Sequence, residues 1–296
     1  RQTRWLSDWS SDVCSSDLKL GFEVIYLPVS KEGVVAIEDV QSVLTRDTIL
    51  VSVMHVNNEI GSVQPIKAIG TVINGYNQNE KTTIKFHVDA VQGFGKIDLD
   101  VKACYIDLMT VSGHKIHALK GTGALYCNSA TVLAPLFFGG QQENGIRPGT
   151  ENILGIIAFG IACEETFLKR KQRFERCFSL KERMIQHLSA IDGFKINGLS
   201  DSPYILNLSF PGIKAEVLLH TLEMNEVYIS TGSACSSKKK NQSHVLKAIG
   251  LSDVDIEGAI RLSFGDGLNE ACIDEAAAWI VKAVESLKHI MVKGKR

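Results

Sequence analysis

The chain has 296 residues, of which 45% are hydrophobic and 22% are charged, and its 32 basic and 33 acidic side chains leave a formal net charge of −1. This composition is typical of a globular protein, and the length exceeds what one hydrophobic core usually supports, so two domains are expected. The balanced charge excludes binding of nucleic acid or membranes through a global basic excess, and no apolar stretch is long enough to span a bilayer.

Residues 1–18 stand apart from the rest of the chain. They hold two of the three tryptophans and repeated Ser-Asp pairs, and they show neither helical nor strand periodicity. They also lack the continuous apolar core of a signal peptide. The stretch resembles translated sequencing-adapter sequence, with a disordered tail as the alternative. We therefore expect a non-native leader that forms no part of the fold, and a protein whose own N-terminal part is missing.

After the leader, strand-like and helix-like segments alternate. The expected strands are short and rich in β-branched residues: 23–29, 48–56, 84–88, 107–111 and 123–127. Apolar residues at helical spacing predict helices at 37–44 and after Pro65, where Ile66, Ile69 and Ile73 share one face. This alternation predicts an α/β fold with a mostly parallel sheet and helices on both faces.

The second half of the chain begins with a long helix, or two joined helices, over 152–191. Shorter elements follow: strands at 204–210 and 260–264, helices near 214–224 and 244–249, and a final helix over 270–290. The final helix carries an apolar stripe that should face a core: Ile273, Ala277, Ile280, Val284 and Leu287. We place the domain junction near residue 171, which gives a large domain over 19–171 and a smaller α+β domain over 172–296.

Polar side chains follow three of the predicted strands. They comprise one carboxylate, one lysine, two carboxamides and hydroxyl and imidazole donors: Asn58, Asp89, Gln92, Ser112, His114 and Lys115. Ligands bind beyond the carboxyl ends of parallel strands, so these side chains are expected near one another. The set suits pyridoxal phosphate, which needs a lysine for a Schiff base, a carboxylate against its pyridinium nitrogen and donors for its phosphate.

Each of these residues alone has a plainer interpretation. An aspartate after a strand usually caps a helix or a turn, and a lysine after Gly-His is usually solvated. His87 and Asp89 have metal-ligand chemistry, but no third or fourth ligand stands at a suitable spacing, so no metal is expected. The coincidence of three strand ends favours the cofactor site.

Six motifs carry a family resemblance. They are HVNNEIG (55–61), FHVDAVQ (86–92), SGHK (112–115), GGQQENGIRPGTEN (139–152), STGSACSS (230–237) and AIRLSFG (259–265). Together they resemble the fold-type-I, class-V aminotransferase superfamily and, within it, the NifS/IscS group of cysteine desulfurases. The resemblance implies the fold of pyridoxal-phosphate-dependent transferases, with a mostly parallel sheet of the seven-stranded type flanked by helices.

The resemblance also implies roles for individual residues. Lys115 corresponds to the Schiff-base lysine and Asp89 to the pyridinium partner. The other ring and phosphate contacts are Asn58, Gln92, Ser112 and His114. Thr150 corresponds to a residue that reaches the phosphate of the neighbouring subunit, so a homodimer is implied.

Two further residues decide the chemistry. Cys235 lies in a loop of small polar residues followed by the lysines 238–240, and positive charge lowers a thiol pKa. A run of lysines alone is more often a solvated surface. The other six cysteines are expected to be small buried hydrophobic residues. Arg261 interrupts an apolar strand and needs a partner. The partner could be a carboxylate of the protein in an internal salt bridge. The resemblance favours the α-carboxylate of an amino-acid substrate, bound with the help of Asn58.

The implied function is that of a cysteine desulfurase, a sulfurtransferase that converts L-cysteine to L-alanine. Lys115 takes the Cα proton, Cys235 takes the sulfur as a persulfide, and a protein acceptor, an iron–sulfur scaffold or a tRNA-thiolation enzyme, receives it. An iron–sulfur contact would be made through Cys235, and no nucleic acid or membrane partner is expected. Alternatives are a selenocysteine lyase, a class-V aminotransferase or, in a different class, a non-catalytic sulfur-relay or scaffold fragment. Seven cysteines without a C-x-x-C pair favour a reducing compartment, the cytoplasm.

The chain departs from the family in two respects. Family members carry a glycine-containing loop at a helix start that cradles the phosphate, and a histidine that stacks on the cofactor ring; we find neither here. A helix N-terminus supplies backbone donors for a phosphate. We therefore expect weak or absent retention of pyridoxal phosphate, which absorbance after desalting measures, and an exposed sheet edge that invites aggregation.

Overall fold

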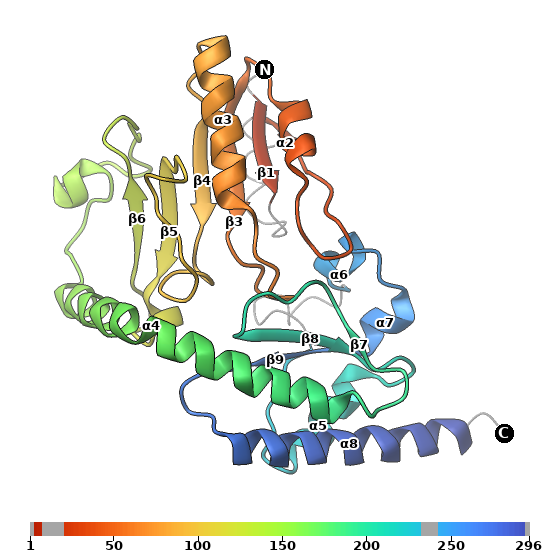
Figure 1. The fold of residues 1–296 in the computed structure, drawn as a ribbon. Helices are drawn as coiled ribbons and strands as arrows, with labels where there is room; N and C mark the ends of the chain where they lie inside the picture. Colours follow the sequence, from red (N-terminus) through yellow and green to blue (C-terminus); the bar gives the residue numbers. More distant parts are fainter. Residues whose placement is uncertain (1–2, 8–20, 232–241, 294–296) are drawn as a thin grey trace. The chain divides into compact units, whose positions relative to one another are not determined.

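The computed structural model describes residues 3–7, 21–231 and 242–293 (Figure 1). The chain divides into two compact units. The first unit consists of Arg1–Leu27, Ile37–His55 and Pro65–Arg170. The second consists of Pro28–Ala36, Val56–Gln64 and Lys171–Arg296.

The sequence places both short segments of the second unit, 28–36 and 56–64, in the large domain, and here the structure differs. Backbone hydrogen bonds explain the difference. The N–H of Leu199 donates to the carbonyl of Glu32 at 3.0 Å, and the N–H of Ser202 donates to that of Gly61 at 2.9 Å. The two segments are therefore held by residues far along the chain.

A six-stranded sheet forms the centre of the first unit, in the order β2-β1-β3-β4-β5-β6. Its strands are β1 (Thr3–Ser7), β2 (Glu23–Ile25), β3 (Thr48–Met54), β4 (Lys85–Asp89), β5 (Leu108–Ser112) and β6 (Gly123–Cys127). Only the pairing of β5 with β6 is antiparallel. The predicted mostly parallel α/β fold is confirmed, with six strands in the described residues where the resemblance implied a sheet of the seven-stranded type.

Strand β1 lies within residues 1–18, and it corrects the expectation that this leader forms no part of the fold. Its backbone pairs in parallel with β2 on one side and β3 on the other, with Trp5 opposite Ile25 and Val51. Parallel pairing uses N–H and C=O groups that almost every residue carries, so an irregular sequence does not prevent it. The segment fills the place between β2 and β3.

Helices α2 (Ile37–Val43) and α3 (Ile66–Glu80) pack against each other in the first unit (Figure 1). Pro65 precedes α3 directly, and Ile66, Ile69 and Ile73 are buried, so the predicted apolar face is confirmed. The long helix α4 (Ile153–Leu188) begins in the first unit and continues into the second. Of the described residues, no helix combines the length and apolarity needed to cross a bilayer.

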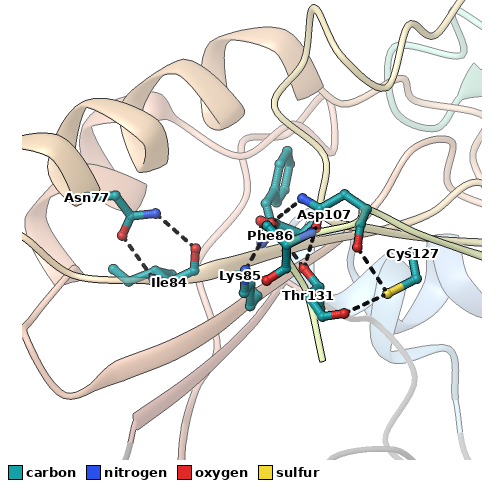
Figure 2. Close-up of polar contacts among 9 residues, drawn as sticks. Asn77, Ile84, Lys85, Phe86, Asp107, Cys127 and Thr131 are labelled. Carbon is teal, nitrogen blue, oxygen red and sulfur yellow. Dashed lines mark hydrogen bonds and ion pairs between the residues drawn. The ribbon is translucent and has the colours of Figure 1, made fainter. Parts of the chain in front are cut away.

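Polar groups form a network of hydrogen bonds and an ion pair at the amino ends of β4 and β5 (Figure 2). The carboxylate of Asp107 accepts hydrogen bonds from the Phe86 N–H at 2.9 Å and from Asn128 Nδ2 at 2.6 Å. Thr131 Oγ1 and Lys85 Nζ each lie 3.4 Å from the same carboxylate. We call Lys85, Phe86, Asp107, Asn128 and Thr131 the amino-end cluster.

The second unit contains a three-stranded antiparallel sheet in the order β7-β8-β9. Its elements are β7 (Lys195–Ile196), β8 (Ile205–Ser209), β9 (Ala259–Ser263), α5 (Ala215–Glu223), α6 (His244–Ala248), α7 (Asp253–Glu257) and α8 (Glu270–Lys293). Every residue of β8 is buried. The predicted stripe of α8 faces this core: Ile273, Ala277, Ile280 and Val284 are buried and Leu287 is partly buried against it. The sequence did not predict β7 or α7.

The described cysteines are free: Cys104, Cys127, Cys163, Cys177 and Cys272. Cys104 and Cys177 are buried as expected. Cys127 and Cys163 are half-buried and Cys272 is exposed, which corrects the expectation that every cysteine other than Cys235 is a buried hydrophobe; Cys14 lies outside the described residues. Cys272 lies in the first turn of α8, one residue before the apolar stripe begins.

Candidate functional site

The carboxyl ends of β4 and β5 lie side by side in the first unit. Asp89 is the register partner of Thr110, and the Ala90 N–H donates to the Thr110 carbonyl at 3.0 Å. Side chains two residues apart on a strand share one face of the sheet, so Ser112 points to the same face as Thr110 and Asp89. The parallel register thus gathers predicted site residues from two strands on one face.

Lys115 follows directly in a single 3-10 turn, Gly113–Ile116. A glycine begins the turn because a Cβ at Gly113 would lie 2.8 Å from Thr122 Oγ1. The Gly113 N–H also donates to the Thr122 carbonyl at 2.9 Å. Lys115 is half-buried. Its Nζ forms no hydrogen bond or ion pair with any residue that the structure describes, so the amine is left available to a ligand.

Neighbouring side chains supply an anchored carboxylate and polar donors. Asp89 is half-buried, and its Oδ1 accepts the Val91 N–H at 2.9 Å, which orients the carboxylate. Gln92 follows in the same turn and is half-buried. Ser112 Oγ lies 2.7 Å from His114 Nδ1, a hydrogen bond whose donor depends on the histidine tautomer.

A chain of hydrogen bonds runs under this site across three strands. His87 Nδ1 lies 2.7 Å from Ser52 Oγ, and His87 Nε2 lies 2.8 Å from Thr110 Oγ1. Both ring nitrogens are engaged with hydroxyls, which argues against His87 as a metal ligand. Across the described parts of the chain, no three or more His, Cys, Asp and Glu side chains gather as a metal site would require. The sequence did not predict these hydrogen bonds; the two-residue spacing that places His87 and Asp89 on one face of β4 was the available signal.

His55 packs against the turn that carries Gln92. Its side chain is buried, and burial lowers the pKa of its imidazole to about 4. A Cβ at Gly93 would lie 2.2 Å from His55 Nδ1, so only glycine fits against the ring. The His55 N–H donates to the Asp89 carbonyl at 2.8 Å. The His55 backbone therefore holds the end of β4, while its neutral imidazole packs against Gly93 in the following turn.

In the second unit, the turn 57–61 presents Asn58. Asn57 Oδ1 accepts the N–H groups of Glu59 at 2.9 Å and Ile60 at 3.0 Å. Gly61 closes the turn at φ +74°, where a Cβ would lie 3.1 Å from the Ile205 carbonyl oxygen. Asn57, Glu59 and Ile60 are buried, whereas Asn58 is half-buried. The turn therefore leaves the Asn58 side chain accessible.

Arg261 is partly buried on β9 and is held by neutral oxygens. Nη1 donates to the Asn58 carbonyl at 3.0 Å, and Nη2 donates to Ser230 Oγ at 3.4 Å. Burial lowers the pKa of Arg261, and the charge of nearby Glu59 raises it. Within the described ranges Nε is buried without a hydrogen-bond partner and no carboxylate pairs with the guanidinium. This arrangement suits an external carboxylate better than an internal salt bridge.

The structure distributes the predicted residues as follows. Lys115 and its neighbours gather in the first unit, and Asn58 and Arg261 share contacts in the second. Thr150 is exposed in the segment before α4. Cys235 lies outside the described residues. The first-unit donor set fits pyridoxal phosphate, because an uncommitted amine and an oriented carboxylate stand beside hydroxyl and imidazole groups on adjacent strand ends.

Comparisons with known proteins agree with this chemistry. A family model described as aminotransferase class-V matches residues 6–274. A cysteine desulfurase IscS of Clostridium botulinum (strain Hall) is 42% identical over 277 residues, which cover 92% of this chain and 68% of that protein. A putative cysteine desulfurase, IscS 1 of Bacillus subtilis, is 41% identical over 271 residues, 90% of this chain and 70% of that protein.

A solved structure of a NifS-like protein matches with a TM-score of 0.85 at 30% sequence identity, and the match covers 98% of this chain and 76% of the other. The chain thus spans about two thirds to three quarters of the length of the proteins it matches. The chain belongs to the class-V aminotransferase family, in the group of cysteine desulfurases that includes IscS and NifS.

Proposed function

We propose that this chain is a pyridoxal-phosphate-dependent cysteine desulfurase that converts L-cysteine to L-alanine and passes the sulfur to a protein acceptor. The observation that carries the proposal is the Lys115 amine, which lacks a partner among the described residues and stands one strand away from the oriented Asp89 carboxylate. Relatives named as cysteine desulfurases, 42% and 41% identical, support the choice of reaction.

The first unit holds the cofactor. Bound pyridoxal phosphate supplies an electron sink that makes the Cα proton of the substrate removable. Asp89 holds the pyridine nitrogen in its protonated form, and the Lys115 amine binds the cofactor and accepts the Cα proton. The remaining ring and phosphate contacts of this unit come from Gln92, Ser112 and His114. The family resemblance adds Asn58, and it adds Thr150 from a second copy.

The second unit binds the substrate. Arg261 offers the Nε–H and the remaining guanidinium donors to the α-carboxylate, and a planar guanidinium matches a carboxylate bidentately. The thiolate of Cys235 attacks the sulfur of L-cysteine, so that an S–S bond forms on Cys235 as the Cβ–S bond breaks. The electron pair stays with Cβ, which takes up a proton to give alanine. The persulfide then passes to an iron–sulfur scaffold or a tRNA-thiolation enzyme.

A homodimer is part of the proposal. The segment around the start of α4 exposes many large apolar side chains: Val132, Leu136, Phe137, Phe138, Ile153, Leu154, Ile157 and Ile161. So many exposed large apolar side chains between residues 132 and 161 favour a partner surface. Thr150 lies within this stretch, so a second copy seated there brings its own Thr150 close to the interface. Free cysteines support a reducing, cytoplasmic location.

The experiment that tests the function replaces Cys235 by serine. With pyridoxal phosphate supplied in excess, Cys235→Ser should keep the cofactor absorbance and lose sulfide release from L-cysteine. The exposed Cys272 provides the matched control, because Cys272→Ser removes a thiol without touching the proposed chemistry. Sulfide release by Cys235→Ser at the unaltered rate would contradict the proposal. A keto acid product in place of alanine and sulfide would indicate an aminotransferase.

A further inference from the structure

Glu59 has a buried carboxylate next to the proposed substrate-binding arginine, and a serine far along the chain engages it. Glu59 is 4% exposed. Ser243 Oγ donates to Glu59 Oε2 at 2.6 Å. Ser243 is also the N-cap of α6, where its Oγ accepts the Leu246 N–H at 3.2 Å. Since the oxygen accepts from the backbone, its proton is left to point at the carboxylate.

The backbone of Glu59 is fixed in place from β8 and β9. Asn207 Nδ2 donates to the Glu59 carbonyl at 3.1 Å, next to the bond from Arg261 to the Asn58 carbonyl. Asn207 and Arg261 are register partners across the two strands. Asn197 Nδ2 in turn donates to Asn207 Oδ1 at 2.8 Å, which sets the orientation of the Asn207 amide. The position of the Glu59 carboxylate therefore depends on its side chain alone.

A buried carboxylate this near to a partly buried guanidinium would ordinarily form an ion pair with it, because each charge is costly when unpaired. The structure shows a different arrangement. Arg261 donates to two neutral oxygens, and Glu59 accepts from the Ser243 hydroxyl. Glu59 still favours the charged form of Arg261 from its position nearby. Among the described residues, Arg261 Nε remains without a partner.

We propose that Ser243 is a positioning residue that holds the Glu59 carboxylate away from Arg261, so that the guanidinium stays available to the carboxylate of an amino-acid ligand. This inference rests on the proposed function, in which Arg261 binds the α-carboxylate of the substrate. Without the Ser243 hydroxyl, Glu59 becomes a competitor for the same donors. With the hydroxyl in place, Glu59 stabilises the charge of Arg261 and leaves Nε unoccupied.

The test measures binding of L-alanine to the full chain by isothermal titration, with L-alaninamide, which lacks the carboxylate, as the reference ligand. Ser243→Ala should weaken L-alanine binding about tenfold, because Glu59 then pairs with Arg261. The double variant Glu59→Gln with Ser243→Ala should restore it, because the competitor is gone. Ser243→Thr, which keeps the hydroxyl, should bind as the unaltered chain does.

Ser252→Ala is the matched control. Ser252 is the N-cap of α7, and its hydroxyl donates to Asp255 at 2.8 Å, so the substitution removes the same kind of cap without freeing Glu59. It should leave L-alanine binding unchanged. Unaltered binding by Ser243→Ala, or a double variant as weak as Ser243→Ala, would overturn the inference.

Arg261→Gln separates this inference from the proposed function. If Arg261→Gln loses L-alanine binding while Ser243→Ala keeps it, the role of Ser243 is wrong and that of Arg261 stands. If Arg261→Gln binds L-alanine as well as the unaltered chain does, the role of Arg261 is wrong and the inference falls with it. No binding of L-alanine by the unaltered chain would overturn both.

Discussion

The two ends of β4 and β5 each carry a lysine and an aspartate, and the two lysines differ in their polar contacts. At the amino ends, Asp107 accepts from a backbone N–H and from Asn128, and Lys85 lies within ion-pair distance (Figure 2). At the carboxyl ends, Lys115 has no partner among the described residues, and Asp89 is oriented by the Val91 N–H. The lysine and the aspartate at the amino ends therefore stabilise the fold, whereas the amine of Lys115 at the carboxyl ends is left available for the proposed cofactor.

The second unit repeats the contrast with two arginines. Arg183 on α4 binds both oxygens of Asp274 on α8, at 2.6 and 2.7 Å, and also pairs with Glu270. Arg261 contacts two neutral oxygens and keeps Nε unpaired among the described residues. In both units, the basic side chain that is paired with a carboxylate stabilises the fold. The basic side chain without a carboxylate partner among the described residues belongs to the proposed site.

Lys115→Ala should have the largest effect. The variant loses both the cofactor-binding amine and the proposed base, so kcat for L-cysteine should fall about 10³-fold. The free energy of unfolding should change by less than about 0.5 kcal/mol, because Lys115 makes no polar contact within the described residues. Lys120→Ala, an exposed lysine nearby, is the control. A large loss of stability in Lys115→Ala would show that Lys115, like Lys85, stabilises the fold.

Asp107→Ala should instead damage the fold. The substitution leaves the Phe86 N–H and the Asn128 amide without this acceptor and removes the ion pair of Lys85, and it should lower the free energy of unfolding by about 3 kcal/mol. Asp47 also directly precedes a strand but is exposed, so Asp47→Ala is the matched control. Urea unfolding of both variants measures the difference, and equal midpoints would show that the amino-end cluster is not structural.

His55 predicts a pH dependence at the carboxyl end. Its pKa in the folded chain is about 4, below the ordinary value of 6.5, because burial disfavours the imidazolium. Between pH 6.5 and 4 the unfolded chain binds a proton that the folded chain does not, so stability should fall by up to about 3 kcal/mol as the pH is lowered through this window. Urea titrations at both ends of the window should show a smaller decline for His55→Asn. An identical decline would contradict this assignment.

The smallest effect is expected at the surface pair of the second unit. Hydrogen bonds from Arg183 and His187 lower the pKa of Asp274 to about 2 from 3.8. A carboxylate with a lowered pKa stabilises the fold above 3.8, and this contribution is lost as the pH falls toward 2. The thermal midpoints of the unaltered chain and Asp274→Asn should therefore converge as the pH is lowered. A constant difference would show that the ion pair is not its source.

Periodicity predicted most of the fold, and the elements it missed have physical reasons. The apolar faces of α3 and α8 and the parallel sheet follow from spacing alone. Strand β1 pairs through its backbone, and β7 and α7 are too short to show a period. The predicted strand 84–88 is found at Lys85–Asp89, so Asp89 ends the strand instead of following it.

The candidate site was only partly predictable. Asp89, Ser112 and Lys115 could be placed together because parallel strands end at one edge of a sheet. The hydrogen bonds of His87 depend on the register of three strands, which the sequence does not reveal. Ser243 and Glu59 are 184 residues apart, and no local pattern links them.

The most direct test of the central claim is to locate the lysine that pyridoxal phosphate occupies. The full chain is incubated with pyridoxal phosphate, reduced with borohydride and digested, and the modified peptide is identified by mass spectrometry. We predict modification at Lys115 and its loss when L-cysteine is added before reduction. Modification spread over exposed lysines, with Lys115 unmodified, would contradict the assignment of this edge of the sheet as the cofactor site.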